Sequence, residues 1–134
     1  MRKFLLLAAA VAATGLVVVA AAVAATDRGI NPVFVSGNPD CKDLGVTSAI
    51  QAKFEQPADG ATDGRVTLLG LSSNGVGWYV LNNEDVDAVI VKGGSGANVY
   101  RYPGGDFSDG GLTTPLNKGG KPAALGYVTV CYTP

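Results

Sequence analysis

The fold of this chain is limited above all by its short apolar runs, which are rich in valine, isoleucine and tyrosine and end at glycine, proline or aspartate. Such runs are typical of strands joined by turns. We expect strands at residues 65–71, 76–82, 86–92, 97–102 and 124–132, whereas segment 46–54 suits either a strand or a short helix. Strands spaced about ten residues apart favour an all-β fold, an antiparallel β-sandwich of about six to seven strands. A closed barrel is the second choice.

The glycine-rich stretch Gly93-Gly94-Ser95-Gly96 lies between two of these expected strands. A phosphate-binding loop would be followed by a lysine and a helix, and a nucleophile elbow would need a helix and a histidine base. Neither context is present, since strand-like residues follow the stretch and the chain contains no histidine. We therefore interpret it as a hairpin turn in which at least one glycine has a positive φ angle.

Two other segments carry turn signals. Asn74-Gly75 predicts a two-residue hairpin turn, because these residue types tolerate positive φ angles. Residues 103–122 are dense in glycine, proline and aspartate, so we expect a long irregular loop there. Phe107, Leu112 and Leu116 are the side chains expected to attach that loop to the body of the domain.

The first 24 residues have the features of a secretory signal peptide. Met1-Arg2-Lys3 is basic, a long apolar run follows, and Ala22-Val23-Ala24 matches a cleavage site. An uncleaved anchor is the alternative, because the run is long enough to cross a bilayer. Its alanine-rich composition and small-residue end favour cleavage. We expect one secreted, extracellular domain at 25–134, with no membrane span after cleavage.

Cys41 and Cys131 are the two cysteines of the chain and lie near opposite ends of the expected domain. In an oxidising compartment such a pair predicts a disulfide. A metal site or a redox motif has less support, since the chain has neither histidine nor Cys-x-x-C spacing.

Charge limits the choice of partner. Cleavage would remove Arg2 and Lys3 and leave eight basic and eleven acidic side chains, a net charge of −3. The remaining basic residues are scattered along the sequence, whereas nucleic acids select clustered lysine and arginine. We therefore expect no nucleic-acid partner, and an extracellular ligand or cell-surface component instead.

Acidic residues are the remaining candidates for chemistry. Two carboxylates could hydrolyse a glycosidic bond, and the candidate groups are Asp59 with Asp63, Asp106 with Asp109, and Glu84 with Asp85 and Asp87. Calcium is a candidate cofactor because it prefers oxygen ligands in loops; its ligands would come from Glu84, Asp85, Asp87, Asp106 and Asp109. Aspartates in turns commonly serve local hydrogen bonding instead, so we assign no catalytic residue.

Aromatic residues allow two interpretations. Tyr100 and Tyr102 alternate along one expected strand and therefore share a face. If that face is exposed, the two rings form a small ligand-binding stripe, with Arg101 on the other side. Otherwise they belong to the core, where we also place Trp78.

Three motifs together resemble a group of uncharacterised secreted or surface bacterial proteins. The first is the pattern V-x-x-V-x-V-K-G-G-x-x-x-N-x-Y-x-Y from Val86 to Tyr102, the second is Asp109-Gly110-Gly111-Leu112, and the third is Cys131-Tyr132 in the last expected strand. The resemblance implies a similar fold and an extracellular location, and it carries no activity.

The function expected from these features is that of a non-catalytic extracellular surface, matrix or binding module. The alternative is a small secreted hydrolase with two carboxylates. A pocket with two close acidic side chains would favour the hydrolase, whereas an aromatic or calcium-binding cluster on a flat surface would favour the module.

Overall fold

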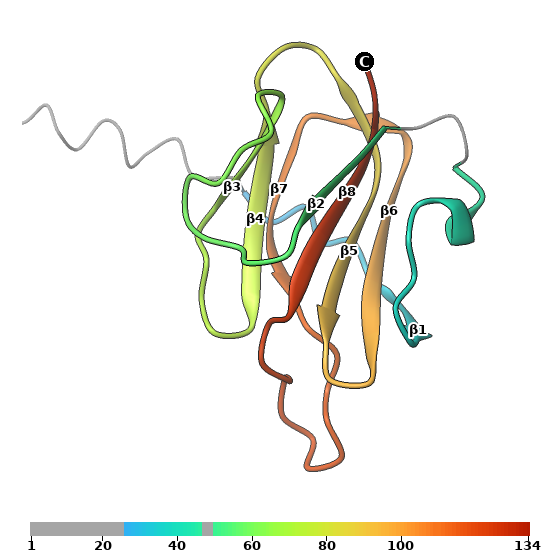
Figure 1. Ribbon diagram of the computed structural model, residues 1–134, viewed down its shortest axis with the longest axis vertical. Coiled ribbons are helices and arrows are strands. Elements are labelled where there is room, and N and C mark those ends of the chain that lie inside the picture. Colours follow the sequence, from blue (N-terminus) through green and yellow to red (C-terminus); the bar gives the residue numbers. More distant parts are fainter. Residues whose placement is uncertain (1–25, 47–49) are drawn as a thin grey trace, which may run out of the picture.

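The computed structural model describes residues 26–46 and 50–134, which form two antiparallel β-sheets (Figure 1). The larger sheet has the strand order β1-β6-β5-β8-β2 and the smaller one β3-β4-β7. The elements are β1 (Val33–Ser36), the 3-10 helix η1 (Lys42–Leu44), β2 (Ile50–Phe54), β3 (Val66–Leu69), β4 (Gly75–Val80), β5 (Asp85–Gly93), β6 (Gly96–Asp106), β7 (Ser108–Thr113) and β8 (Tyr127–Thr133). The expected antiparallel sandwich with one disulfide is confirmed, with eight strands in the described residues.

The expected signal peptide at residues 1–24 lies outside the described residues. Within 26–46 and 50–134, no helix is long and apolar enough to cross a membrane. The ambiguous segment 46–54 ends in strand β2, which pairs with β8 from Ile50 to Phe54.

The two sheets pack face to face around one apolar core. The smaller sheet contributes Val66, Leu68, Val76 and Trp78, and the larger sheet contributes Val86, Val89, Val91, Tyr100, Val128 and Val130. Trp78 is fully buried, as expected. Burial of each such valine or leucine side chain contributes about 1.5–3 kcal/mol to folding.

The outer face of the larger sheet is buried as well. Ala88, Ile90, Val99 and Cys131 pack on this face beneath a covering segment, residues 37–46. Strands that are buried on both faces contain continuous apolar runs. This explains why the run Ala88-Val89-Ile90-Val91 of β5 shows no alternation of polar and apolar residues.

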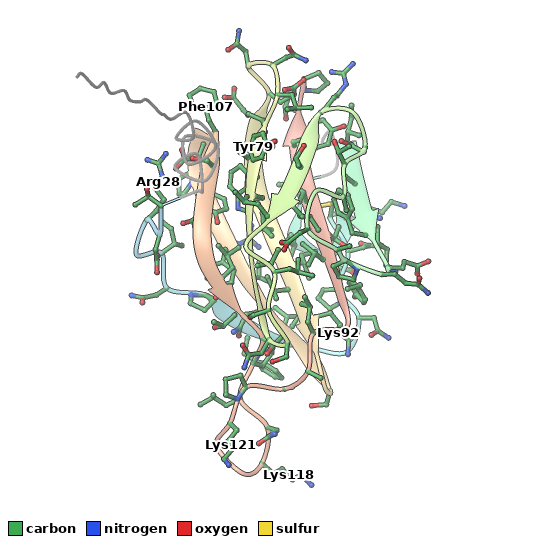
Figure 2. All side chains as sticks on the ribbon, turned by 90° about the vertical axis from the view of Figure 1, so that its left-hand side faces the viewer. Arg28, Tyr79, Lys92, Phe107, Lys118 and Lys121 are labelled. Atoms are coloured by element: carbon green, nitrogen blue, oxygen red, sulfur yellow. A yellow bond between two sulfur atoms is a disulfide. The ribbon has the colours of Figure 1, made fainter. Side chains whose placement is uncertain are left out.

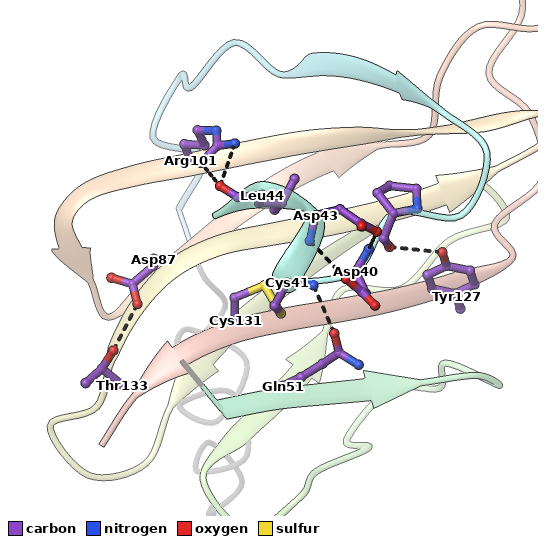
Figure 3. Close-up of a disulfide and its surroundings, with 11 residues drawn as sticks. Asp40, Cys41, Asp43, Leu44, Gln51, Asp87, Arg101, Tyr127, Cys131 and Thr133 are labelled. Atoms are coloured by element: carbon purple, nitrogen blue, oxygen red, sulfur yellow. Dashed lines mark hydrogen bonds between the residues drawn. A yellow bond between two sulfur atoms is a disulfide. The ribbon is translucent and has the colours of Figure 1, made fainter. Parts of the chain in front are cut away.

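The covering segment is attached to the sheet covalently and by hydrogen bonds (Figure 3). The Cys41–Cys131 disulfide joins it to β8 with a Cα–Cα distance of 5.8 Å. The backbone N–H of Cys41 donates to Gln51 of β2 at 3.0 Å. The guanidinium of Arg101, on β6, donates to the carbonyl oxygen of Leu44 at 3.3 Å. The predicted disulfide therefore closes a second, smaller apolar layer.

The hairpin between β3 and β4 is present, but its turn differs from the expected one. Residues 70–74 connect the two strands, and Gly70 has the positive φ, 62°. Neither Asn74 nor Gly75 has a positive φ, so the two-residue turn is wrong. Gly75 lies in β4, where a Cβ would come within 3.2 Å of the carbonyl oxygen of Leu112.

The expected irregular loop at 103–122 is strand in its first half. β6 continues to Asp106, and β7 follows at once. Gly104 and Gly105, with φ angles of 82° and 83°, allow β6 to bulge within its pairing with β5. Of the three expected attachment points, Leu112 is buried, whereas Phe107 and Leu116 are 54% and 67% exposed. The last two assignments are therefore wrong.

Candidate functional site

A cleft of about 170 Å³ lies at one end of the sandwich, where the β5–β6 turn meets the chain between β7 and β8. An apolar cavity of about 150 Å³ holds a benzene ring, so this cleft has room for one six-membered ring. No lining residue is acidic; they are Phe34, Gly93, Gly94, Ser95, Pro115, Leu116, Asn117, Lys118 and Ala123.

The β5–β6 turn forms the floor of the cleft. Gly93 pairs with Gly96, so Gly94-Ser95 is a two-residue turn, and Gly94 has a φ of 68°. The expectation of a positive φ in this stretch is confirmed, and glycine at the first turn position is typical of a type II′ turn. A Cβ on Gly93 would lie 2.8 Å from the side chain of Thr114, and one on Gly96 would lie 2.5 Å from the ring of Phe34. These two glycines therefore make room for neighbouring elements.

A hairpin-like loop, residues 114–124, which we call the finger, forms the second wall; its two sides are joined by one isolated β-bridge, Leu116 to Pro122. Ala123 N–H donates to the Pro115 carbonyl at 2.9 Å, and Asn117 N–H donates to the Lys121 carbonyl at 2.7 Å. At the base of the finger, the hydroxyl of buried Thr114 donates to the carbonyl of Ala123. These bonds give the finger a defined shape although it has no hydrophobic core of its own.

Three lysines lie toward this end of the molecule, two together on the finger and one apart from them on the body of the sheets (Figure 2). Lys118 and Lys121 lie on the finger, and Lys92 lies at the end of β5, where its ammonium donates to the carbonyl of Gly94. The ion pairs found across the described ranges are Arg28–Asp106, Lys53–Glu55 and Arg65–Glu84, so they include none of these three lysines. The fold thus brings Lys92 to the same end as Lys118 and Lys121, which are already close in the sequence.

The acidic candidates Glu84 and Asp106 lie at the opposite end of β5 and β6 and are bound to arginines. Buried Glu84 lies 3.5 Å from Arg65, measured from Oε1 to Nη1. Asp106 lies 3.3 Å from Arg28, measured from Oδ1 to Nη2. Both carboxylates therefore have structural partners.

Asp109 belongs to a buried polar network. Its carboxylate accepts hydrogen bonds from the Tyr102 hydroxyl at 2.6 Å and from the N–H groups of Arg28 and Gly110 at 2.8 Å. The indole N–H of Trp78 donates to the Tyr102 oxygen at 3.3 Å. Burial, and then the bond to Asp109, raise the pKa of Tyr102 far above its usual value. The Tyr102 hydroxyl therefore stays protonated and donates a hydrogen bond to the Asp109 carboxylate.

Three further candidate carboxylates, those of Asp87, Asp63 and Asp59, are also hydrogen-bonded. Asp87 accepts from the Thr133 hydroxyl at 3.0 Å, and Asp63 accepts from the Tyr132 hydroxyl at 2.8 Å. Burial, and then this bond to Asp63, raise the pKa of Tyr132 to about 12. Asp59 accepts the Leu71 N–H at 2.7 Å.

The structure gives no support to the expected calcium ligands. Among the described residues, no group of three or more acidic, cysteine or histidine side chains is arranged to hold a metal ion. Asp85, the one candidate not yet placed, is exposed and lies beside Gly105.

Tyr100 and Tyr102 share one face, as expected, but that face points into the core. They are 4% and 3% exposed, so the condition for a surface stripe is not met. The exposed aromatic residue at the cleft is Phe34 of β1, a strand that was not among those expected from the sequence. The short run Val33–Ser36, with its valines and phenylalanine, was the available signal.

Comparison of the chain with protein-family models, with curated proteins and with solved structures found no match in any of the three. The resemblance based on residues 86–102 therefore stays a prediction.

Proposed function

We propose that the protein is a non-catalytic, secreted bacterial binding module that contacts an extracellular ligand or cell-surface component through the cleft. The observation that carries this proposal is the exposure of two large apolar side chains at one ring-sized cleft. Phe34 is 53% exposed and Leu116 is 67% exposed, although neither is needed to fill the core. Exposed apolar groups rimmed by polar residues are typical of interaction sites.

The close packing of the residues that form the cleft supports the same function. Gly96 lets the ring of Phe34 lie directly against the backbone of β6, and Gly93 lets Thr114 pack against the end of β5. A preformed site loses less conformational entropy when a ligand binds. Both walls are therefore suited to recognition without a large rearrangement.

A hydrolase with paired carboxylates receives less support. A general acid needs a raised pKa and access to substrate. Asp109 is buried, Glu84 is buried against Arg65, and Asp106 is paired with Arg28. The cleft itself is lined by no carboxylate.

The proposed extracellular location of the module rests on two features. The disulfide fits an oxidising compartment, and the basic and apolar first 24 residues fit export.

Substitution of two exposed leucines, one at the cleft and one far from it, tests whether the cleft is the binding site. Leu116 lines it, whereas Leu81, 46% exposed, follows β4 near the opposite end of the sandwich. We expect Leu116→Ser to weaken retention of the purified domain on washed producer cells about tenfold, because about 1.5 kcal/mol of apolar burial is lost. Leu81→Ser is the control and should bind like the wild type. Equal retention of both variants and the wild type would contradict the proposed site.

A further inference from the structure

We infer that the cleft takes an anionic six-membered ring, of the kind that a uronic-acid residue of an acidic extracellular polysaccharide presents. This inference rests on the proposed function, because it names the ligand class for the same cleft. It combines the size of the cleft, its apolar walls and the lysines at its edge.

The apolar walls suit the C–H face of a sugar ring. Phe34 lies against the backbone at Gly96 and leaves about half of its surface exposed. An aromatic face is electron-rich and attracts the positively polarised C–H groups of a pyranose. Leu116, on the finger, adds apolar surface at the same cleft. With a volume of about 170 Å³, the cleft matches one ring rather than several.

The charge at the cleft favours a carboxylate on that ring. Lys118 lines the cleft, and Lys92 and Lys121 lie at the same end (Figure 2). This end is basic although acidic side chains outnumber basic ones in the chain. A bond between an ammonium and a carboxylate is stronger than one between neutral groups, and local positive charge attracts an anionic polymer. A neutral sugar could accept hydrogen bonds from these lysines but would lack the attraction between opposite charges.

The finger favours a polymer over an isolated acid. Asn117 holds the finger tip through its side-chain oxygen, which accepts from the N–H groups of Gly119 at 2.9 Å and Lys121 at 3.2 Å. The tip lies beyond the sheets, at the exposed end of the molecule (Figure 1). We expect Lys118 and Lys121, both on the finger, to contact carboxylates of such a polymer beyond the ring that the cleft holds.

The test is a calorimetric titration of the domain, residues 25–134, with trimers of galacturonate and of mannuronate and with their methyl esters. The esters keep the rings and remove the charge. We expect at least one acid trimer to bind, its ester to bind about tenfold more weakly, and the affinity to fall between about 0.02 and 0.5 M salt. Lys118→Ala should weaken acid binding about tenfold. Lys42→Ala, which alters an exposed lysine of the covering segment, should leave it unchanged.

Three results would overturn the inference. If acid and ester bind equally and Leu116→Ser weakens both, the anionic ligand is wrong while the proposed binding function stands. If Lys118→Ala binds the acid like the wild type, the trimer occupies another site. If neither acid trimer binds, the ligand class is wrong, and the cell-retention comparison of Leu116→Ser with Leu81→Ser decides the proposed function separately.

Discussion

Replacing both Cys41 and Cys131 with alanine is expected to lower the free energy of unfolding by about 4–5 kcal/mol, because the bond closes a loop of about ninety residues. The bond also attaches the covering segment, so its loss loosens the layer over Ala88, Ile90 and Val99. Small domains have total stabilities of about 5–15 kcal/mol, so the variant should be marginally folded. Urea unfolding followed by tryptophan fluorescence measures the effect through buried Trp78.

The single variant Cys41→Ala is the matched control for that experiment. It should lose almost as much stability as the double variant, because either substitution breaks the same bond. A double variant that unfolds at the wild-type urea midpoint would contradict the stabilising role of the disulfide.

Valine at Gly93 or Gly96 is expected to destabilise the domain by about 1–3 kcal/mol, the usual range for overpacking. A Cβ at Gly96 would lie 2.5 Å from the Phe34 ring and 2.6 Å from the Val35 carbonyl, so backbone must move as well. Gly94→Val should cost about 1–2 kcal/mol for a different reason, the positive φ. Denaturant titration of the three variants measures these losses.

Gly119 provides the matched control for the glycine variants. It lies at the finger tip, and a Cβ there would meet only the side-chain oxygen of Asn117, at 3.3 Å. Gly119→Val should unfold close to the wild-type midpoint. Wild-type midpoints for the Gly93, Gly94 and Gly96 variants would contradict a structural role of these glycines.

The strands that the sequence predicts well are those with strong local patterns. β5 and β8 contain valine-rich runs whose composition alone favours a strand. β7, with the sequence Ser-Asp-Gly-Gly-Leu-Thr, has no such preference. It is a strand because it pairs with β4 and because Tyr102 and the backbone of Arg28 satisfy its buried Asp109. β4 and Arg28 are distant from β7 in the sequence, so no local pattern reveals these contacts.

The same limit applies to the candidate site. The turn at Gly94 follows from local glycine chemistry and was predictable. The cleft was not, because the strand order places Phe34 of β1 beside β6 and the finger brings Leu116 and Lys118 to the same end. Glycine is needed at positions 93 and 96 because Thr114 and Phe34, which are far away in the sequence, pack against them.

Amide chemical-shift mapping tests the central claim, that this cleft is the contact site of a non-catalytic binding module. The isotope-labelled domain would be titrated with the soluble extracellular polysaccharide of the producing cells, and the polymer length would be measured in the same sample. We expect shifts concentrated at residues 93–96 and 115–123, with the polymer unchanged in length. Shifts concentrated at the opposite end of the sandwich, around Asp85 and Asp106, together with shortening of the polymer, would contradict binding at the cleft and support a hydrolase.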